Sequence, residues 1–194
     1  MNRKINFMLM LVVVIFSSCK SLPKFKGEAD LCGLIVDENN APVKDFVIYC
    51  KNDFATNTAL TDESGMFVVH GLNSDTYKIS GQKKNFVKMD DEQFMFTDRS
   101  KIFFFQVESI EGAFKSVEQF IARGEFEKAD ELLNKLYYEK NSPQEAVILM
   151  YRFFLSEEND EKTKIVSAIK NVGQINGEDY SNYTVLLEDL IYEK

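Results

Sequence analysis

The chain has 194 residues, of which 45% are hydrophobic, and its formal net charge is −8. This hydrophobic share is typical of globular proteins and is large enough to build a buried core. The acidic excess is greatest in residues 108–194, which hold 10 basic and 18 acidic residues. Because nucleic-acid binders must neutralise phosphate charge, this balance excludes nucleic acid as an expected partner.

The beginning of the chain has the layout of an export signal. A basic start is followed by an apolar run, two small residues and a cysteine: Arg3, Lys4, residues 5–16, Ser17, Ser18 and Cys19. The run is too short for a transmembrane helix, which needs about 20 residues. The pattern predicts a signal peptide over residues 1–18, and the alternative is an ordinary secretory signal with a chance cysteine at its end.

The Ser-Ser-Cys ending resembles the lipobox of bacterial lipoproteins, although Phe16 stands where an aliphatic residue is usual. The resemblance implies cleavage before Cys19 and lipidation of that cysteine, which would anchor the chain to a membrane of the cell envelope. Residues 19–30 would then form a tether whose lysines are attracted to anionic headgroups. No Asp follows Cys19, and the resemblance therefore implies sorting to the outer membrane.

Residues 31–107 have the composition of a β-sandwich. Short runs of β-branched and aromatic residues alternate with turn-forming residues at intervals of about eight to twelve positions, which is typical of sandwiches. The predicted strands are residues 31–36, 46–50, 66–70, 77–80, 93–96 and 102–107.

The order of turn and core residues in this segment resembles the carboxypeptidase regulatory-like domain, a transthyretin-like (prealbumin-like) sandwich. The most specific element is Thr-Asp-x-x-Gly-x-Phe, in which Asp62 can close an Asx-turn, Gly65 can take a positive φ and Phe67 can enter the core. Asn40 replaces the glycine usual before Pro42 and tolerates the left-handed conformation. The resemblance implies a rigid accessory module without catalytic residues.

From Ser109 onward the spacing of apolar residues changes from 2 to 3.6, which predicts helices. Gly124 separates the first two helices, and Ser142 followed by Pro143 predicts a capped start for the third. Asn159 is the expected cap of the fourth helix, which should end near Gly173. The apolar stripes contain Ile110, Phe114, Val117, Phe120 and Ile121; Phe126, Ala129, Leu132, Leu133 and Leu136; Ala146, Val147, Leu149, Met150, Phe153 and Phe154; Ile165, Val166, Ile169 and Val172; and Tyr183, Leu186, Leu187, Leu190 and Ile191.

The turn between the first two predicted helices resembles that of a tetratricopeptide repeat. Gly124, Phe126 and Ala129 match the turn and the start of the second helix, with Leu133 at the next packing position and Pro143 near the end of the repeat. The resemblance implies two helical hairpins and a capping helix. Because about three repeats are normally needed for stability, the hairpins should dock on the sandwich or on a partner.

The sequence thus predicts an α+β protein with separate domains: a seven-strand-type β-sandwich over residues 31–107, followed by an all-α helical-hairpin domain over residues 108–194. Residues 1–18 and 19–30 precede them as signal peptide and tether.

Residues that could form a catalytic or metal site are scarce. His70 is the single histidine and is expected in a surface turn, without a second ligand at metal-binding spacing. Ser167 and Lys170 match a Ser-x-x-Lys pattern but lack its partner motifs. Residues 90–92 are acidic and are expected in a solvated loop rather than in a Ca²⁺ site. Residues 103–105 are three phenylalanines, expected in a core strand, although one outward ring could stack on a sugar or peptide. The sequence therefore predicts no enzyme, metal or cofactor.

Two cysteines remain after Cys19. Export makes a disulfide between Cys32 and Cys50 chemically feasible. In the resembled domain Cys50 would face the core and Cys32 the opposite face of its strand, which favours two unpaired thiols and leaves the disulfide as the alternative.

These observations predict a membrane-anchored envelope lipoprotein that acts as a non-catalytic binding or scaffolding module. A protein or peptide partner should bind the helical domain. The alternative is a carbohydrate-binding envelope lipoprotein, which would require exposed aromatic side chains on one face; the chain has no Trp.

Overall fold

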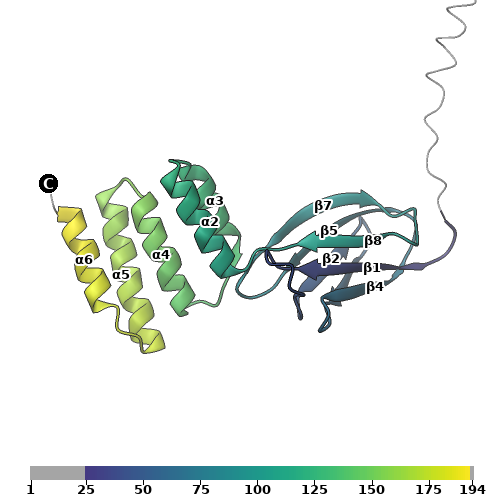
Figure 1. The fold of residues 1–194 in the computed structure, drawn as a ribbon, viewed down its shortest axis with the longest axis horizontal. Coiled ribbons are helices and arrows are strands. Elements are labelled where there is room, and N and C mark those ends of the chain that lie inside the picture. Colours follow the sequence, from purple (N-terminus) through teal and green to yellow (C-terminus); the bar gives the residue numbers. More distant parts are fainter. Residues whose placement is uncertain (1–24, 193–194) are drawn as a thin grey trace, which may run out of the picture.

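The computed structural model describes residues 25–192 and places a β-sandwich beside a stack of helices (Figure 1). This arrangement confirms the predicted α+β fold class. The expected signal peptide and Cys19 lie outside the described residues. No helix in the described part of the chain is both long enough and apolar enough to cross a membrane.

The sandwich is built from two sheets. The first sheet has the strand order β4-β1-β8, with β1 (Ala29–Val36) between β4 (Met66–Leu72) and β8 (Ile102–Gln106). The second has the order β3-β2-β5-β7, formed by β3 (Thr56–Leu60), β2 (Val47–Lys51), β5 (Thr76–Gln82) and β7 (Met89–Met95). All pairs are antiparallel except β1 with β8, which is parallel.

Alternation along the strands places one set of side chains between the two sheets. Leu31 and Ile35 of β1 pack there with Ile48 and Cys50 of β2, and all four are fully buried. Because successive residues of a strand point to opposite faces, the residues between them face outward. The same core contains Val43, Phe46, Phe67, Val69, Leu72, Tyr77, Ile79, Phe96, Phe103 and Val107.

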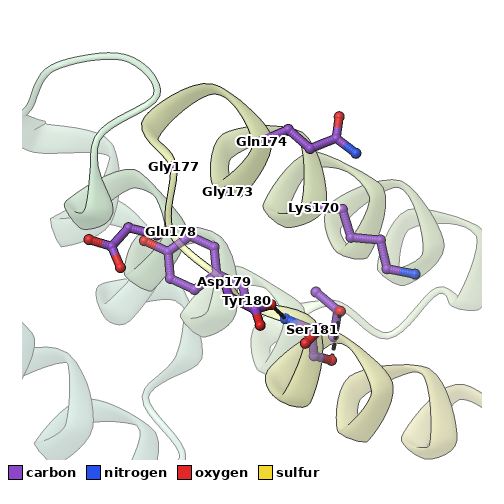
Figure 2. Close-up of a pocket in the computed structure, with 9 residues that line it drawn as sticks. Lys170, Gly173, Gln174, Gly177, Glu178, Asp179, Tyr180 and Ser181 are labelled. Atoms are coloured by element: carbon purple, nitrogen blue, oxygen red, sulfur yellow. Dashed lines mark hydrogen bonds between the residues drawn. The ribbon is translucent and has the colours of Figure 1, made fainter.

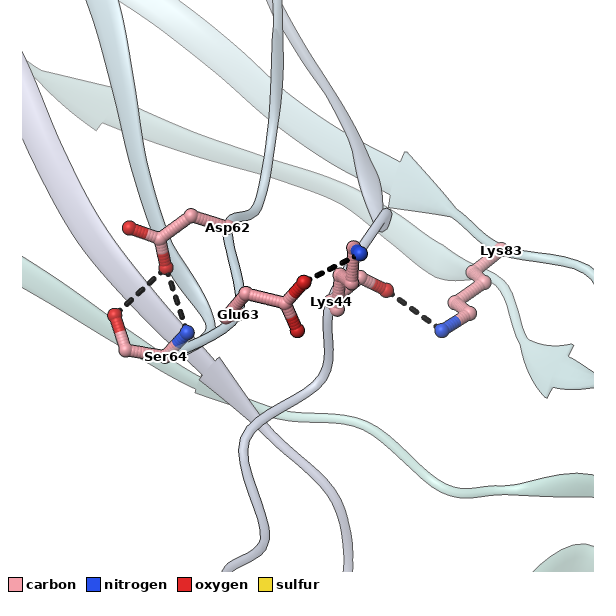
Figure 3. A network of polar contacts seen from close by, with 5 residues as sticks. All are labelled: Lys44, Asp62, Glu63, Ser64 and Lys83. Atoms are coloured by element: carbon pink, nitrogen blue, oxygen red, sulfur yellow. Dashed lines mark hydrogen bonds and ion pairs between the residues drawn. The ribbon is translucent and has the colours of Figure 1, made fainter.

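The turn before β4 has the predicted chemistry (Figure 3). One carboxylate oxygen of Asp62 accepts hydrogen bonds from the Ser64 amide at 2.9 Å, the Ser64 hydroxyl at 2.7 Å and the Met66 amide at 3.0 Å. Gly65 has a φ of 76°, and Phe67 is buried in the core. The Asx-turn and the positive φ are therefore confirmed, and so is the left-handed Asn40, with a φ of 62°.

Three expectations for the sandwich were wrong. The polar strand β3 was not expected; it pairs with β2 although its sequence is TNTAL. Residues 90–92 lie in the edge strand β7, not in a loop, because β5 supplies a pairing partner. His70 lies within β4 rather than in the turn after it, because pairing with β1 extends β4 to Leu72.

The helical stack contains α2 (Ile110–Ala122), α3 (Phe126–Lys135), α4 (Pro143–Leu155), α5 (Asn159–Asn176) and α6 (Ser181–Tyr192). Short turns join successive helices, which lie side by side (Figure 1). The predicted start of α4 is confirmed, because the Ser142 hydroxyl accepts a hydrogen bond from the Glu145 amide at 3.3 Å.

Two predicted helix ends were wrong. Asn159 is the first helical residue of α5 and not its cap, which is Glu158. The helix also continues past Gly173 to Asn176 and ends at Gly177, which has the left-handed conformation. Gly173 serves a different purpose: a Cβ there would lie 2.7 Å from the Glu178 carbonyl oxygen, so its absence lets the following loop cross close to α5.

The helices dock on one end of the sandwich through a small sheet. β6 (Phe86–Val87) of the sandwich pairs with β9 (Leu136–Tyr137), which follows α3. At the same junction, the Glu38 carboxylate accepts hydrogen bonds from the Ser109 amide at 2.9 Å and the Ser109 hydroxyl at 2.6 Å. The Ser109 hydroxyl also accepts from the Gly112 amide and caps α2. Of the two alternatives left open by the sequence, docking on the sandwich is therefore observed.

Candidate functional site

The side chains considered for catalysis do not form a reactive cluster. His70 is exposed and lies 3.0 Å from the Asp30 carboxylate. The Ser167 hydroxyl donates to the Thr163 carbonyl at 3.0 Å, while Lys170 pairs with Glu188 at 2.6 Å. Among residues 25–192, no group of three His, Cys, Asp or Glu side chains could hold a metal ion. These positions offer neither an activated nucleophile nor a metal ligand set.

The two described cysteines carry free thiols. Cys50 is buried in the core, and burial raises the pKa of its thiol to about 12. Cys32 is half-buried on the outer face of the first sheet, where it pairs across the strands with Val68 and Ile102. The two thiols therefore occupy different environments.

The most suitable binding feature of the helical stack is a groove between α3 and α4, here called the α3–α4 groove. It encloses about 500 Å³ and is lined by Phe126, Glu127, Asp130, Asn134, Arg152, Leu155, Ser156 and Glu161. Phe126 stands at the start of α3 because Gly124, with a φ of 73°, turns the chain back after α2. Its ring is 54% exposed, which leaves an aromatic surface uncovered at the groove.

A chain of hydrogen bonds crosses the groove from one helix to the next. The Arg152 guanidinium donates to the Asn134 side chain at 2.7 Å, and Asn134 donates to the Asp130 carboxylate at 2.9 Å. The Ser156 hydroxyl donates to Glu161 at 2.8 Å. The Nε atom of Arg152 is buried and has no hydrogen-bond partner within the described residues. The groove therefore has polar walls whose side chains are held in place by hydrogen bonds to one another.

The charges of the groove are mostly negative. Glu127, Asp130 and Glu161 contribute three carboxylates against the single guanidinium of Arg152. An acidic concave surface with an exposed ring suits a segment that carries basic and apolar side chains, because charge complementarity guides encounter and apolar contact supplies affinity. The arrangement can bind such a segment but contains no group that would activate a bond.

A second hollow of about 450 Å³ lies where α5 turns into α6 (Figure 2). Gly173, Gly177 and the residues 178–181 line it. The Ser181 amide donates to the Asp179 carboxylate at 2.9 Å. Hydrogen bonds from the backbone and the side chain of Ser181 lower the pKa of Asp179. These polar groups stabilise the turn that begins α6, so we assign the hollow a structural role and not a binding role.

A third hollow, of about 590 Å³, lies beside the turn between β2 and β3. The side-chain oxygen Oδ1 of Asn52 accepts hydrogen bonds from the Phe54 amide at 3.0 Å and the Ala55 amide at 2.8 Å. This Asx-turn holds the Phe54 ring in solvent, where it is 89% exposed. Asp75 and Gln93 are among the polar residues that line the hollow.

The phenylalanines 103–105 divide between two faces. Phe103 is buried between the sheets, Phe105 is half-buried and Phe104 points outward with 61% of its surface exposed. The alternative of one outward ring is thus the observed arrangement, while Phe103 supports the core assignment. Phe54 and Arg152 were not predicted from the sequence, because no helix or strand periodicity marks an isolated exposed ring or a guanidinium with one buried nitrogen.

No family model matches the chain, and no curated protein matches it. Solved structures with partial similarity include the Bacillus anthracis TIE protein, at 12% identity and a TM-score of 0.39 over 43% of this chain and 17% of that one. A proposed carbohydrate-binding protein from Bacteroides uniformis is 17% identical, with a TM-score of 0.37 over 42% of each chain. A DUF3823 family protein from Bacteroides ovatus is 14% identical, with a TM-score of 0.35 over 41% of this chain and 44% of that one. The matched part thus spans less than half of each of these proteins, and TM-scores below 0.5 decide neither family nor function.

Proposed function

We propose that the chain is a lipid-anchored envelope protein that binds a protein partner through its helical stack and carries out no catalysis. The observation that carries this proposal is the α3–α4 groove, in which three carboxylates and the exposed Phe126 ring lie together. The partner segment would be basic and amphipathic. Its lysines or arginines would meet the carboxylates, and an apolar side chain would cover the ring.

The anchor rests on the sequence around Cys19. A basic start, an apolar run and two serines precede this cysteine in the order typical of lipoproteins. Acyl chains contribute about 0.8 kcal/mol per buried CH₂ group, so several chains would attach the protein firmly. Outer-membrane sorting belongs to the same proposal.

The exposed side of the last helix also supports a binding role for the stack. Leu187 and Ile191 of α6 face the other helices and are buried, whereas Tyr183, Leu186 and Leu190 form an exposed stripe. In a tetratricopeptide-like stack such a stripe is normally covered by the next helix. The two hairpins, the left-handed Gly124 and the added α6 support that likeness.

The anchor is tested by the variant Cys19→Ala in cells given labelled palmitate. The expected result is loss of label, release from the membrane fraction and accumulation of a longer precursor. If palmitate still enters the variant protein, the lipoprotein proposal is wrong.

The groove is tested in cells by placing a photo-crosslinking amino acid at Phe126 of the full chain. The same amino acid at Asp189, an exposed position on α6, is the control. The expected result is one protein product that forms from position 126, not from 189, and that disappears when Glu127→Lys is added. A product that is insensitive to Glu127→Lys contradicts the groove.

Carbohydrate binding is the second candidate, and the exposed Phe54 ring favours it. Aromatic rings beside convergent hydrogen-bonding groups suit sugar rings, and Phe54 stands beside Asp75 and Gln93. Titration of the full chain with a panel of soluble glycans, monitored by calorimetry, tests this candidate. It requires binding that Phe54→Ala removes, and heat that survives this substitution would rule out the Phe54 site.

A further inference from the structure

One end of the sandwich is formed by turns that lie beside the beginning of the described chain. Lys51 at the end of β2 pairs with Thr56 of β3 and with Lys78 of β5. Thr76, where β5 begins, pairs with Met95, where β7 ends. The connection from β7 to β8 lies at the end where the chain enters β1, away from the helical stack (Figure 1). We call this surface the turn end; it consists of residues 25–28, 52–55, 73–75 and 96–101.

Hydrogen bonds join the segments of the turn end to one another. The side-chain amide of Asn52 donates to the Asp75 carboxylate at 3.2 Å. The Phe96 amide donates to the Asp75 carbonyl at 2.8 Å, and the Arg99 guanidinium donates to the Lys26 carbonyl at 2.5 Å. The segments are therefore held in fixed positions and present one surface.

The described chain is attached to the turn end from its first residue. The Phe25 ring packs edge-on against Phe96, with 5.3 Å between centroids, and the Arg99 guanidinium lies 4.5 Å from the Phe25 centroid. Cys19 precedes Phe25 by six positions. Their Cα atoms lie at most about 22 Å apart, because an extended chain spans at most about 3.6 Å per residue. An acyl anchor at Cys19 would therefore keep the turn end, and not the helical stack, next to the membrane.

The turn end carries the most exposed large apolar side chain of the described residues. This side chain is Phe54, which is 89% exposed in the turn between β2 and β3. The hydrogen bonds from the Phe54 and Ala55 amides to Asn52 fix the turn, so the ring is held away from the sandwich core. Proteins that lie on membranes place such rings at the boundary between headgroups and acyl chains, where apolar surface is removed from water.

The charge of the turn end also suits a lipid surface better than that of the helical stack. The turn end has three basic and four acidic residues, which are Lys26, Arg99 and Lys101, and Glu28, Asp53, Asp75 and Asp98. Residues 108–194 have 10 basic and 18 acidic residues. Anionic headgroups would therefore repel the helical stack and leave the turn end almost unaffected.

We propose that the turn end rests on the phospholipid surface of the membrane that holds Cys19, with the Phe54 ring inserted between the headgroups. This inference rests on the lipid anchor of the proposed function. A single attachment through Cys19 leaves the sandwich free to tilt, whereas a second contact at Phe54 fixes its orientation. The helical stack would then point away from the membrane. Insertion excludes glycan binding by the same ring, because both would cover it.

The test places a fluorescent reporter in the ring position. The chain has no Trp, so Phe54→Trp gives the full lipidated protein a single Trp at the turn end. The protein is reconstituted into phosphatidylcholine vesicles with brominated acyl chains, which quench Trp on contact. Phe154→Trp is the matched control, because Phe154 is also an exposed phenylalanine, at 59%, and lies on α4. The expected result is loss of emission for Phe54→Trp and unchanged emission for Phe154→Trp.

Flotation of the same samples with the vesicles separates failure of the inference from failure of the anchor. If the protein floats but Phe54→Trp emits equally in brominated and unbrominated vesicles, the turn-end contact is overturned and the anchor stands. Equal quenching of both variants would also overturn it, because the preference of Trp for membrane interfaces is the same in both. If the protein does not float, the anchor itself is wrong, and the inference fails with it. Emission of Phe54→Trp that responds to soluble glycans but not to vesicles would assign the ring to glycan binding.

Discussion

At the scale of single residues, backbone geometry and burial set the demands on side chains. Gly65 combines a φ of 76° with a carbonyl oxygen of Ile35 only 2.4 Å from where a Cβ would lie. Gly124 has a similar φ of 73° but open space around it. A side chain at Gly65 is therefore disfavoured both by the positive φ and by the close carbonyl oxygen, whereas at Gly124 only the positive φ disfavours it.

Replacement of Gly65 by Val should lower the free energy of unfolding by at least about 2 kcal/mol, because strain at positive φ adds to contact with the Ile35 carbonyl. Gly124→Ala is the control and should cost only about 1 kcal/mol. Urea denaturation of the full chain measures both values. Equal losses would mean that the close contact at Gly65 has no energetic consequence.

The two described thiols should differ in reactivity with iodoacetamide at pH 8. Burial raises the pKa of Cys50 to about 12, so almost none of this thiol is ionised at pH 8, and the thiolate is the reactive form. Cys32, half-buried on the outer face, should react first. Mass mapping of the alkylated peptides checks this order, and rapid labelling of Cys50 in the folded chain would contradict its buried position.

The turn at Asp62–Phe67 could be predicted from the sequence because its hydrogen bonds join residues at most four positions apart. The same locality explains the successful cap at Ser142. The exposure of Phe54 and the buried Arg152 Nε could not be predicted in this way, since both depend on which distant elements lie nearby.

At the scale of elements, some strands form because of pairing partners far apart in the sequence, and the periodicity of their own residues does not predict them. β3 is polar and becomes a strand because β2 lies beside it, and β6 and β9 are two-residue strands that exist only through each other. Pairing with β1 likewise extends β4 past His70 to Leu72. The positions of the helices were predicted more accurately, because a helix makes its backbone hydrogen bonds within itself. Their apolar stripes were wrong in part: Phe126, Phe154, Tyr183, Leu186 and Leu190 are exposed, and the buried Ile148 was missed.

The junction between sandwich and helices should depend on pH through Glu38. Burial raises the pKa of this carboxyl, but the hydrogen bonds from Ser109 and the charge of Lys115 outweigh it and hold the pKa below its usual value. A lowered folded-state pKa means that the contribution is present above the unfolded value, about 4.3, and is lost as pH falls through the folded value.

Replacement of Glu38 by Gln should therefore lower the melting temperature at pH 7, with a loss of about 1 kcal/mol, because the charged acceptor at Ser109 is removed. The difference between the two proteins should shrink as the pH falls below about 4. Thermal unfolding followed by circular dichroism checks this prediction, in buffers from about pH 3 to about pH 7 that bracket the unfolded pKa of glutamate. A constant difference at every pH would show that charge at Glu38 is not involved.

At the scale of the whole molecule, the sandwich separates the beginning of the described chain from the helical stack (Figure 1). A tether at Cys19 would thus hold the stack away from the membrane with the rigid sandwich between them. The helical segment also carries most of the acidic excess. This distribution is compatible with the proposed division into an anchored spacer and a recognition part. The sequence suggested that division through the lipobox and repeat resemblances and the charge balance, without locating the groove.

The most direct test of this account is the affinity of the full chain for an amphipathic peptide of Leu and Lys, measured by fluorescence anisotropy. Glu127→Lys should weaken binding by about ten-fold, because it places a like charge in the α3–α4 groove, while Asp189→Lys on α6 should change it less than about two-fold. Added salt should weaken binding, since exposed charges are screened beyond about 8 Å at physiological ionic strength. Equal effects of the two variants, or affinity that is unchanged by Glu127→Lys, would contradict recognition through the groove.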